Sequence, residues 1–285
     1  MEKYQQVERS IYTTYRKPIW NKFVEGIKTY QMLKEGDSVC VCLSGGKDSM
    51  LLAKCMQHLQ AYSDFPFDLK FMILDPGYAP EVRSYILQNA ETLHVPVQIF
   101  EANIFNYVAA QGGSPCYLCA RMRRGYLYKY AQSLGCNKIA LGHHFDDVIE
   151  TILMSMLYSG EMKTMMPKLH STSHPGMELI RPLYLVKEQD ILRWVKRNDL
   201  HFIRCACRFE EMCSAKEEEE SSGKRAQTKA LIAQLRKTNA NVDMNILRAV
   251  EDVNLETLIG YRKGERHVSF LDDYDTITPA DAEST

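Results

Sequence analysis

The stretch Val39-Cys40-Val41-Cys42-Leu43-Ser44-Gly45-Gly46-Lys47-Asp48-Ser49 decides the fold of this chain. Its first five residues form an apolar run that predicts a buried strand, and a helical pattern follows the turn at once. A strand that passes into a helix through a glycine turn presents backbone N–H groups to an anion. Gly45 and Gly46 allow the backbone to approach a phosphate, and Lys47 adds a positive charge. The stretch therefore predicts a phosphate-binding turn, and an ordinary turn with a surface lysine is the simpler alternative.

The same turn resembles the Ser-Gly-Gly-x-Asp-Ser loop of the ATP pyrophosphatases, the PP-loop family. It lacks the spacing of a Walker A loop, in which four residues separate a glycine from Gly-Lys-Ser/Thr. The resemblance implies that the loop binds the pyrophosphate end of ATP and that the reaction leaves an adenylated substrate. The residues concerned are Ser44, Gly45, Gly46, Lys47, Asp48 and Ser49.

Predicted strands and helices alternate from residue 37 onward. The apolar runs predict strands at residues 38–43, 69–74, 95–100, 138–141 and 178–183. The segments between and after them predict helices at residues 48–62, 80–92, 103–110, from about 116 to 134, 145–158 and 188–197. Short apolar strands separated by helices are typical of an α/β fold with a doubly wound parallel sheet. Ligands of such sheets bind at the carboxyl ends of the strands, so we expect residues 44–49, Asp75, the Cys116 region and residues 142–147 to share one crevice.

Both ends of the chain predict helical extensions. Residues 1–36 have apolar positions at spacings of three and four, with basic residues between them that form either a solvated face or an arm that touches RNA. Residues 160–176 form a predicted loop that is long enough to act as a lid over the crevice. Residues 211–285 predict a linker, helices over residues 224–260 and an acidic tail. The predicted domains are therefore 1–36, 37–210 and 211–285.

The composition is that of an ordinary globular protein, with 285 residues and a formal net charge of −1. It contains no apolar run of about 18 residues and no apolar signal core at its N-terminus, so we expect a cytoplasmic protein with no membrane partner. The net charge does not by itself indicate nucleic-acid binding, although a local basic face suffices for it. Nine cysteines in such a chain predict thiols or metal ligands, and Cys40, Cys42 and Cys55 fit small core residues.

Cys116 and Cys119 form a C-x-x-C pair that is able to share one metal or cluster. A redox pair and half of a zinc site are the alternatives, but the chain has no second C-x-x-C to complete four ligands. Cys205 or Cys207 provides a third thiolate. Three protein thiolates leave an open coordination position, which suits a centre that does chemistry. The spacing alone fits zinc and an iron–sulfur cluster about equally.

Asp146 and Asp147 follow a predicted strand and begin a helix. Helix capping explains one acidic residue there, whereas two near an ATP site predict magnesium coordination or the positioning of a reacting group. His143 is a candidate nucleotide contact. Arg123 lies in a segment of arginines and tyrosines, residues 121–130, that fits either phosphate contact with base stacking or the packing of a core helix.

Taken together, residues 44–49, 115–119, 121–125 and 142–147 resemble the tRNA 2-thiocytidine synthetase family. The resemblance covers roughly residues 35–210 and is closest over 141–168. It implies a Rossmann-like PP-loop fold, binding of ATP and Mg²⁺, and an oxygen-sensitive [4Fe–4S] cluster on three cysteines. It also implies the replacement of the C2 oxygen of an anticodon-loop cytidine, cytidine 32, by sulfur to give 2-thiocytidine.

The family pattern carries over to individual residues of this chain. Cys116 and Cys119 match the first two cluster ligands, and Cys205 matches the third, with Cys207 as the alternative because the family has C-x-x-C where this chain has C-x-C. The carry-over assigns magnesium to the carboxylates and the compensation of phosphate charge to Lys47 and Arg123. The residues expected at the ATP and magnesium site outside the loop are Asp75, Arg123, Gly142, His143, Asp146 and Asp147, in addition to Asp48 within it.

We therefore predict an ATP-dependent tRNA sulfurtransferase that forms AMP and pyrophosphate. Its expected partners are tRNA and a sulfur donor, either a cysteine desulfurase or free sulfide, and a homodimer is the default assembly. Two alternatives remain. The first is another adenylating PP-loop enzyme, with 2-thiouridine or lysidine- and amide-type chemistry, and the second is a zinc- and nucleotide-binding RNA module.

Overall fold

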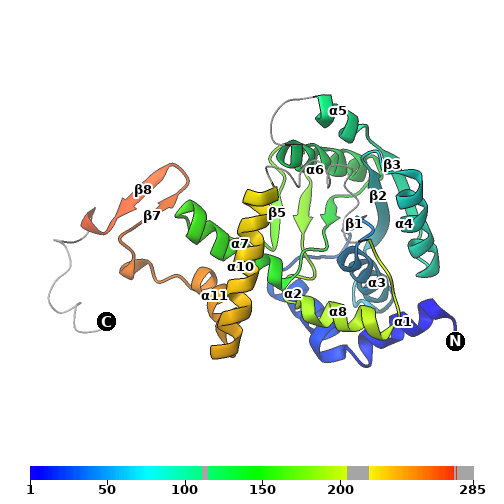
Figure 1. Cartoon of the computed structure of the whole chain (residues 1–285), viewed down its shortest axis with the longest axis horizontal. Helices are drawn as coiled ribbons and strands as arrows, with labels where there is room; N and C mark the ends of the chain where they lie inside the picture. Colours follow the sequence, from blue (N-terminus) through cyan, green and yellow to red (C-terminus); the bar gives the residue numbers. More distant parts are fainter. Residues whose placement is uncertain (111–114, 204–217, 273, 275–285) are drawn as a thin grey trace.

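The computed structural model of the chain describes residues 1–110, 115–203, 218–272 and 274 (Figure 1). Its centre is a six-stranded sheet in the order β3-β2-β1-β4-β6-β5, in which all neighbours pair parallel except β5 and β6. The strands are β1 (Ser38–Leu43), β2 (Asp68–Asp75), β3 (Val97–Glu101), β4 (Lys138–Ala140), β5 (Lys168–His170) and β6 (Glu178–Ile180). The predicted α/β class with a mostly parallel sheet is confirmed.

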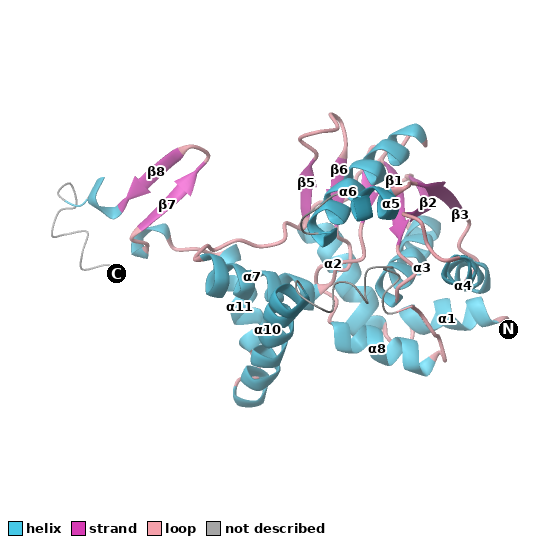
Figure 2. Ribbon diagram, turned by 45° about the horizontal axis from the view of Figure 1, so that its top comes forward, coloured by secondary structure: helices cyan, strands magenta, loops and turns pink. Residues whose placement is uncertain are grey.

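Strand β1 is buried on both of its faces. Val39 and Val41 pack into the larger hydrophobic core with helix α3 (Lys47–Tyr62), whereas Cys40 and Cys42 pack with helix α6 (Pro115–Ser133) on the opposite face. Figure 2 shows these two helices on opposite sides of the sheet. Side chains alternate along a strand, so a strand covered on both faces reads as one continuous apolar run. The buried cysteines of β1, and Cys55 of α3, are small core residues as predicted.

The remaining helices of the α/β body begin and end within a few residues of their predicted bounds. They are α4 (Pro80–Thr92), α5 (Ile104–Ala110), α7 (Phe145–Ser159) and α8 (Glu188–Arg197). The strand order reverses between β1 and β4, because β2 and β3 lie on one side of β1 and β4 and β6 lie on the other. Such a switch point opens a crevice at the carboxyl ends of the two strands. The turns after β1 and β4 therefore meet there.

The N-terminal extension belongs to the core of the body. It consists of α1 (Lys3–Tyr12), a π-helical segment (Arg16–Asn21) and α2 (Lys22–Thr29). Ile11, Ile19 and Phe23 are fully buried in the larger core. The Tyr15 hydroxyl also donates a hydrogen bond to the Arg193 carbonyl of α8 at 2.8 Å. The predicted domain boundaries stay predictions, but this helical segment does not have a core of its own.

Two segments differ from the sequence-based prediction. Residues 160–176 contain the edge strand β5, a three-residue strand too short to leave a periodic pattern in the sequence. The predicted helical region at residues 224–260 consists of α10 (Glu218–Thr238), α11 (Val242–Glu251) and a 3₁₀ turn (Leu255–Thr257). A hairpin of β7 (Gly260–Lys263) and β8 (Arg266–Ser269), which the sequence analysis did not predict, follows them. Helices α10 and α11 pack beside α7, and the hairpin stands clear of the sheet (Figure 1).

None of the helices in the described segments combines the length and the apolar character that a membrane crossing requires.

Candidate ATP site and its carboxylate cluster

The turn between β1 and α3 is a rigid loop fixed by its own serines. Ser49 Oγ donates to the Gly46 carbonyl at 2.9 Å and accepts from Ser44 N at 3.2 Å. Gly45 has φ +82°, and a Cβ on it would stand 2.6 Å from Cγ1 of Ile86, so only glycine fits this position. Gly46 is the N-cap of α3. The first turn of the helix therefore presents its N–H groups at the crevice, as an anion site requires.

Gly142, which follows β4, lies directly against this loop. A Cβ on Gly142 would stand 2.9 Å from Ser49 N and 3.0 Å from the carbonyl carbon of Asp48. Both atoms belong to the backbone of the first turn of α3, which has no freedom to move aside as a side-chain tip does. The predicted meeting of residues 44–49 with residues 142–147 is thus a backbone-to-backbone contact.

Lys47 and Asp48 carry the charges of the loop. Lys47 Nζ lies 3.0 Å from Asp48 Oδ2 and 3.3 Å from Oε1 of Glu188 in α8. Asp48 Oδ1 is buried and has no hydrogen-bond partner within the described parts of the chain, although His144 Nε2 lies 3.9 Å away. A buried carboxylate oxygen without a partner is unfavourable unless a cation or donor satisfies it. The loop therefore fits a nucleotide that arrives with a divalent cation.

Asp146 and Asp147 are both engaged by protein groups. Asp146 accepts from the Glu188 backbone N–H at 2.7 Å and from Arg236 Nη2 at 2.6 Å. Asp147 accepts from the His144 backbone N–H at 3.1 Å in a capping box, and its other oxygen lies 3.2 Å from Arg225 Nη2. The capping interpretation holds for Asp147. A magnesium role for these two carboxylates stays a prediction, and Asp48 has the more available oxygen.

Helix α10 has a basic face that was not predicted from the sequence. Arg225 donates to Glu150 at 2.8 Å, Lys229 to Glu188 at 2.6 Å and Arg236 to Asp243 of α11 at 2.8 Å. A cavity of about 310 Å³ lies between α10 and α7, lined by His144, Asp147, Glu150, Glu188, Arg225, Ala226 and Lys229. Arg225, Lys229 and Arg236 are four and seven residues apart, so they share one face of the helix. That spacing is a signal in the sequence, but their acidic partners became apparent only in the fold.

Glu188 links the loop to α10. It contacts Lys47 through one oxygen and Lys229 through the other. Burial acts to raise the pKa of Glu188, but the hydrogen bond from Lys229 and the charges of both lysines outweigh it and hold that pKa below its usual value. Glu188 is therefore an anion that positions the lysine of the loop.

His143 is half-buried beside the guanidinium of Arg181. Burial, followed by the charge of Arg181, lowers the pKa of His143 to about 4. Arg181 Nε lies 3.3 Å from His143 Nδ1 and donates to it. Burial also lowers the pKa of Arg181, to about 10. His143 is thus neutral near pH 7, and its contact with a nucleotide stays a prediction.

Asp75 is the last residue of β2, and Arg123 of α6 lies against Phe105 of α5. Asp75 Oδ1 accepts from the backbone N–H groups of Gly77 at 2.8 Å and Tyr78 at 2.7 Å, which fixes the turn after the strand. The guanidinium of Arg123 lies over the ring of Phe105, 5.4 Å from its centroid. Arg123 Nε is buried without a hydrogen-bond partner among the described residues. Arg123 therefore retains a donor for a ligand, whereas one oxygen of Asp75 is committed to the fold.

The sequence itself places the fold in a known family. Residues 16–207 match the PP-loop domain family over most of the α/β body. The chain belongs to the PP-loop family.

Curated relatives and a solved structure agree with this family. A tRNA-cytidine(32) 2-sulfurtransferase from Coxiella burnetii (strain RSA 331 / Henzerling II) is 34% identical over 243 residues, which cover 83% of this chain and 90% of the relative. The enzyme of that name from Neisseria meningitidis serogroup C (strain 053442) is 40% identical over 187 residues, 64% of this chain and 57% of the relative. The U34-tRNA thiolase NcsA from Methanococcus maripaludis, solved with its [4Fe-4S] cluster, aligns with a TM-score of 0.63 at 21% identity and covers 85% of this chain and 80% of that one. This last likeness confirms the PP-loop fold.

The cysteine pair begins helix α6 of the PP-loop domain. Cys116 and Cys119 are three residues apart in this helix, which is one turn, and Cys119 is buried. A helix that precedes a parallel strand starts at the carboxyl edge of the sheet, so the pair lies at the edge that carries the loop. Cys205 and Cys207 lie outside the described residues. The segment that precedes them contacts the loop. The Ile203 carbonyl oxygen lies 3.8 Å from the position that a Cβ on Gly46 would take.

Proposed function

We propose that this protein is an ATP-dependent tRNA sulfurtransferase that replaces the C2 oxygen of cytidine 32 in tRNA by sulfur. The relatives that bear this activity in their names include one that the chain covers over 90% of its length. One structural observation carries the mechanism: the Ser44-to-Ser49 loop opens at the switch point against Gly142 and leaves Asp48 Oδ1 without a hydrogen-bond partner among the described residues. Such a loop binds and orients a nucleotide triphosphate.

The first step is the adenylation of the base. The C2 oxygen of the cytidine attacks the α-phosphorus of ATP, an O–P bond forms, and the bond to the β-phosphate breaks with loss of pyrophosphate. The N–H groups of the first turn of α3 and the Lys47 ammonium would stabilise the charge on the phosphates. Asp48 would hold Mg²⁺ through its unpaired oxygen, because Mg²⁺ in such sites binds one or two carboxylates together with phosphate oxygens. Arg123, whose Nε has no hydrogen-bond partner among the described residues, would donate to the same phosphates.

The second step exchanges the activated oxygen for sulfur. A sulfide adds to C2, and AMP leaves with the former base oxygen. A [4Fe–4S] cluster on Cys116, Cys119 and Cys205, or on Cys207 in place of Cys205, would supply an iron with an open position for sulfide. The described residues fit this assignment in part, because the pair at the start of α6 lies one turn apart at the correct edge of the sheet. Zinc on the same thiolates is the alternative.

Three further expectations belong to this proposal. A cysteine desulfurase or free sulfide supplies the sulfur, the protein acts in the cytoplasm, and two copies form a dimer with two-fold symmetry. Exclusion of water from the crevice matters, because water would hydrolyse the adenylated base. Residues near the crevice in the segment 160–176 are candidates for a cover, but strand β5 anchors part of that segment to the sheet.

The test combines two products in one anaerobic reaction. The purified protein is incubated with ATP, Mg²⁺, sulfide and a tRNA transcript that carries cytidine at position 32, with a uridine-32 transcript as control. We expect tRNA-dependent AMP formation, 2-thiocytidine in the digested RNA, and roughly four irons per chain by metal analysis. Full activity of a metal-free protein would contradict the sulfur mechanism and favour nitrogen chemistry.

A cysteine series separates the cluster from the fold. Cys116→Ala and Cys119→Ala are expected to lose the thiolated product and the iron. Cys55→Ala is the matched control, because Cys55 is a fully buried thiol of α3 outside the site and its loss acts on stability alone. Normal thiolation by both α6 variants would overturn the assignment.

A further inference from the structure

The C-terminal hairpin lacks the packing that normally stabilises two strands. Strands β7 and β8 pair only with each other in a separate sheet, joined by a two-residue turn in which Gly264 has φ +65°. In both overall views it stands away from the α/β body, beyond α11 (Figures 1 and 2). An isolated two-stranded hairpin is marginally stable in water. Its presence therefore requires an explanation outside its own hydrogen bonds.

The hairpin also places like charges opposite one another. In its register Lys263 lies opposite Arg266, which is a pair of like charges, and Arg262 lies opposite the imidazole of His267. All four side chains are exposed. Basic groups that lie directly opposite destabilise a strand pair, and only Glu265 in the turn offers an opposite charge within the hairpin. A polyanion would remove this repulsion and release counterions as it binds.

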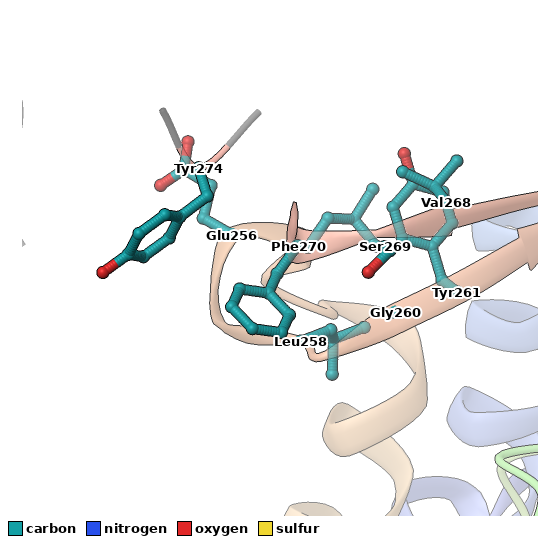
Figure 3. Close-up of a pocket in the computed structure, with 9 residues that line it drawn as sticks. Glu256, Leu258, Gly260, Tyr261, Val268, Ser269, Phe270 and Tyr274 are labelled. Carbon is teal, nitrogen blue, oxygen red and sulfur yellow. The ribbon is translucent and has the colours of Figure 1, made fainter. Parts of the chain in front are cut away.

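An aromatic pocket adjoins the basic strands. It has a volume of about 380 Å³, and its lining includes Leu258, Tyr261, Val268, Phe270, Tyr274 and the carboxylate residue Glu256 (Figure 3). The Tyr274 side chain is 62% exposed and that of Phe270 is 48% exposed, so both rings are open to a ligand. Their planes are nearly perpendicular, with centroids 6.1 Å apart. Exposed aromatic rings beside basic side chains are the usual platform for an unstacked nucleobase.

We propose that residues 255–272 and Tyr274 form an RNA-docking module, in which Arg262, Lys263 and Arg266 bind backbone phosphates and the aromatic pocket receives an unpaired base. This inference rests on the proposed function, which supplies an RNA substrate. A folded tRNA is an extended molecule, so parts remote from the reacting base are available to a surface outside the catalytic body. The module increases affinity and does not take part in the chemistry.

The experiment measures binding of a fluorescein-labelled tRNA transcript by the full-length protein as a function of salt. The triple variant Arg262→Gln, Lys263→Gln, Arg266→Gln is expected to weaken binding roughly tenfold to a hundredfold, with a salt slope of log K about two to three units less steep. The control triple Arg193→Gln, Lys196→Gln, Arg197→Gln removes the same charge from exposed positions of α8 and should leave both quantities near wild type.

A second variant tests the pocket by a different signature. Tyr274→Ala should weaken binding about fivefold or more, because base stacking on an aromatic ring is lost, while the salt slope stays unchanged since no phosphate contact is removed. Truncation after Tyr274 removes Asp275, Asp281 and Glu283 and should leave affinity unchanged or tighter. Weaker binding by the truncated protein would contradict the module.

The outcomes separate this inference from the proposed function. If the hairpin triple binds RNA as wild type does, or changes self-association instead, the module is refuted while thiolation by the wild-type protein stands. If the wild-type protein neither binds the transcript nor forms AMP with it, the proposed function fails first. ATP-analogue binding, which the hairpin variants should retain, verifies that each variant is folded.

Discussion

Gly142→Ala tests whether the contact between β4 and the PP-loop sets the geometry of the ATP site. The added Cβ would stand 2.9 Å from Ser49 N, 3.0 Å from the Asp48 carbonyl carbon and 3.1 Å from Ser49 Cα. Ordinary carbon contacts are about 3.5–4.0 Å, so the first turn of α3 must shift by about half an ångström or more. Gly142 does not have a positive φ, so alanine introduces no backbone strain of its own.

Two effects of this substitution follow from the overlap. Overpacking of a well-packed site costs about 1–3 kcal/mol of the free energy of unfolding. A misplacement of about 1 Å at a reacting group lowers turnover by about 100-fold, so we expect a roughly tenfold to hundredfold loss of tRNA-dependent AMP formation and weaker binding of an ATP analogue. Urea unfolding, calorimetric titration and the AMP assay measure the three quantities at a temperature where the variant is fully folded.

The control is Gly223→Ala in α10. A Cβ there meets no atom within 4 Å, and a helix-interior alanine stabilises by about 0.5–1 kcal/mol relative to glycine. This variant should equal or exceed the wild type in stability and keep its activity. If Gly142→Ala retains wild-type stability, ATP affinity and turnover, the backbone contact does not position the loop, and the steric reasoning is refuted.

Three further outcomes follow from charged groups near the site. Asp48→Asn should retain the fold and lower Mg²⁺-dependent AMP formation by about 100-fold or more; unchanged magnesium dependence in a titration would show that another group holds the ion. The pKa of His143 is lowered to about 4, so between pH 4 and 6.5 the unfolded chain binds a proton on this residue and the folded chain does not. The free energy of unfolding of the wild type, relative to that of His143→Gln, should therefore rise with pH by up to about 1.4 kcal/mol per pH unit in this range and then level off. Denaturation at each pH measures the difference, and parallel curves for the two proteins would contradict this. Burial opposes the ionisation of Asp243, but hydrogen bonds from Arg236 and Lys187 outweigh it and lower the pKa of Asp243. Arg236→Gln should therefore lower the free energy of unfolding by about 1–2 kcal/mol above pH 4, and by progressively less as the pH falls below that value. A difference that does not change with pH would refute the ion-pair interpretation.

The α/β body was predictable because its patterns are local. The strands β1, β2 and β4 each contain an apolar run in the sequence, and the glycine turn marks the junction of β1 with α3. The meeting of the loop with residues 142–147 was also predictable, since parallel strands bring their carboxyl ends to one edge. What no local pattern contains is the contact of Gly142 with the Asp48 and Ser49 backbone, which depends on the spacing of β1 and β4.

The C-terminal half of the site was not predictable for a different reason. In the sequence, Arg225, Lys229 and Arg236 have the pattern of a solvent-exposed helix face. The local sequence does not indicate which carboxylates they contact. The hairpin was missed because its strands are four residues each and are rich in charge, so the alternation of apolar residues that marks a strand is absent.

The carboxylates beside the loop and the cations of α10 together explain why this helix belongs with the proposed ATP site. Asp146, Asp147, Glu150 and Glu188 would, if unpaired, create a negative field beside a loop that binds a polyphosphate. Three of the cations of α10, Arg225, Lys229 and Arg236, each contact at least one of these carboxylates, and Lys47 contacts Glu188 from the other side. The acidic cluster is thereby neutralised before ATP arrives, and the lysine of the loop is held in place by the same network. Helix α10 is therefore an electrostatic part of the proposed nucleotide site, although it lies beyond the residues that match the PP-loop family.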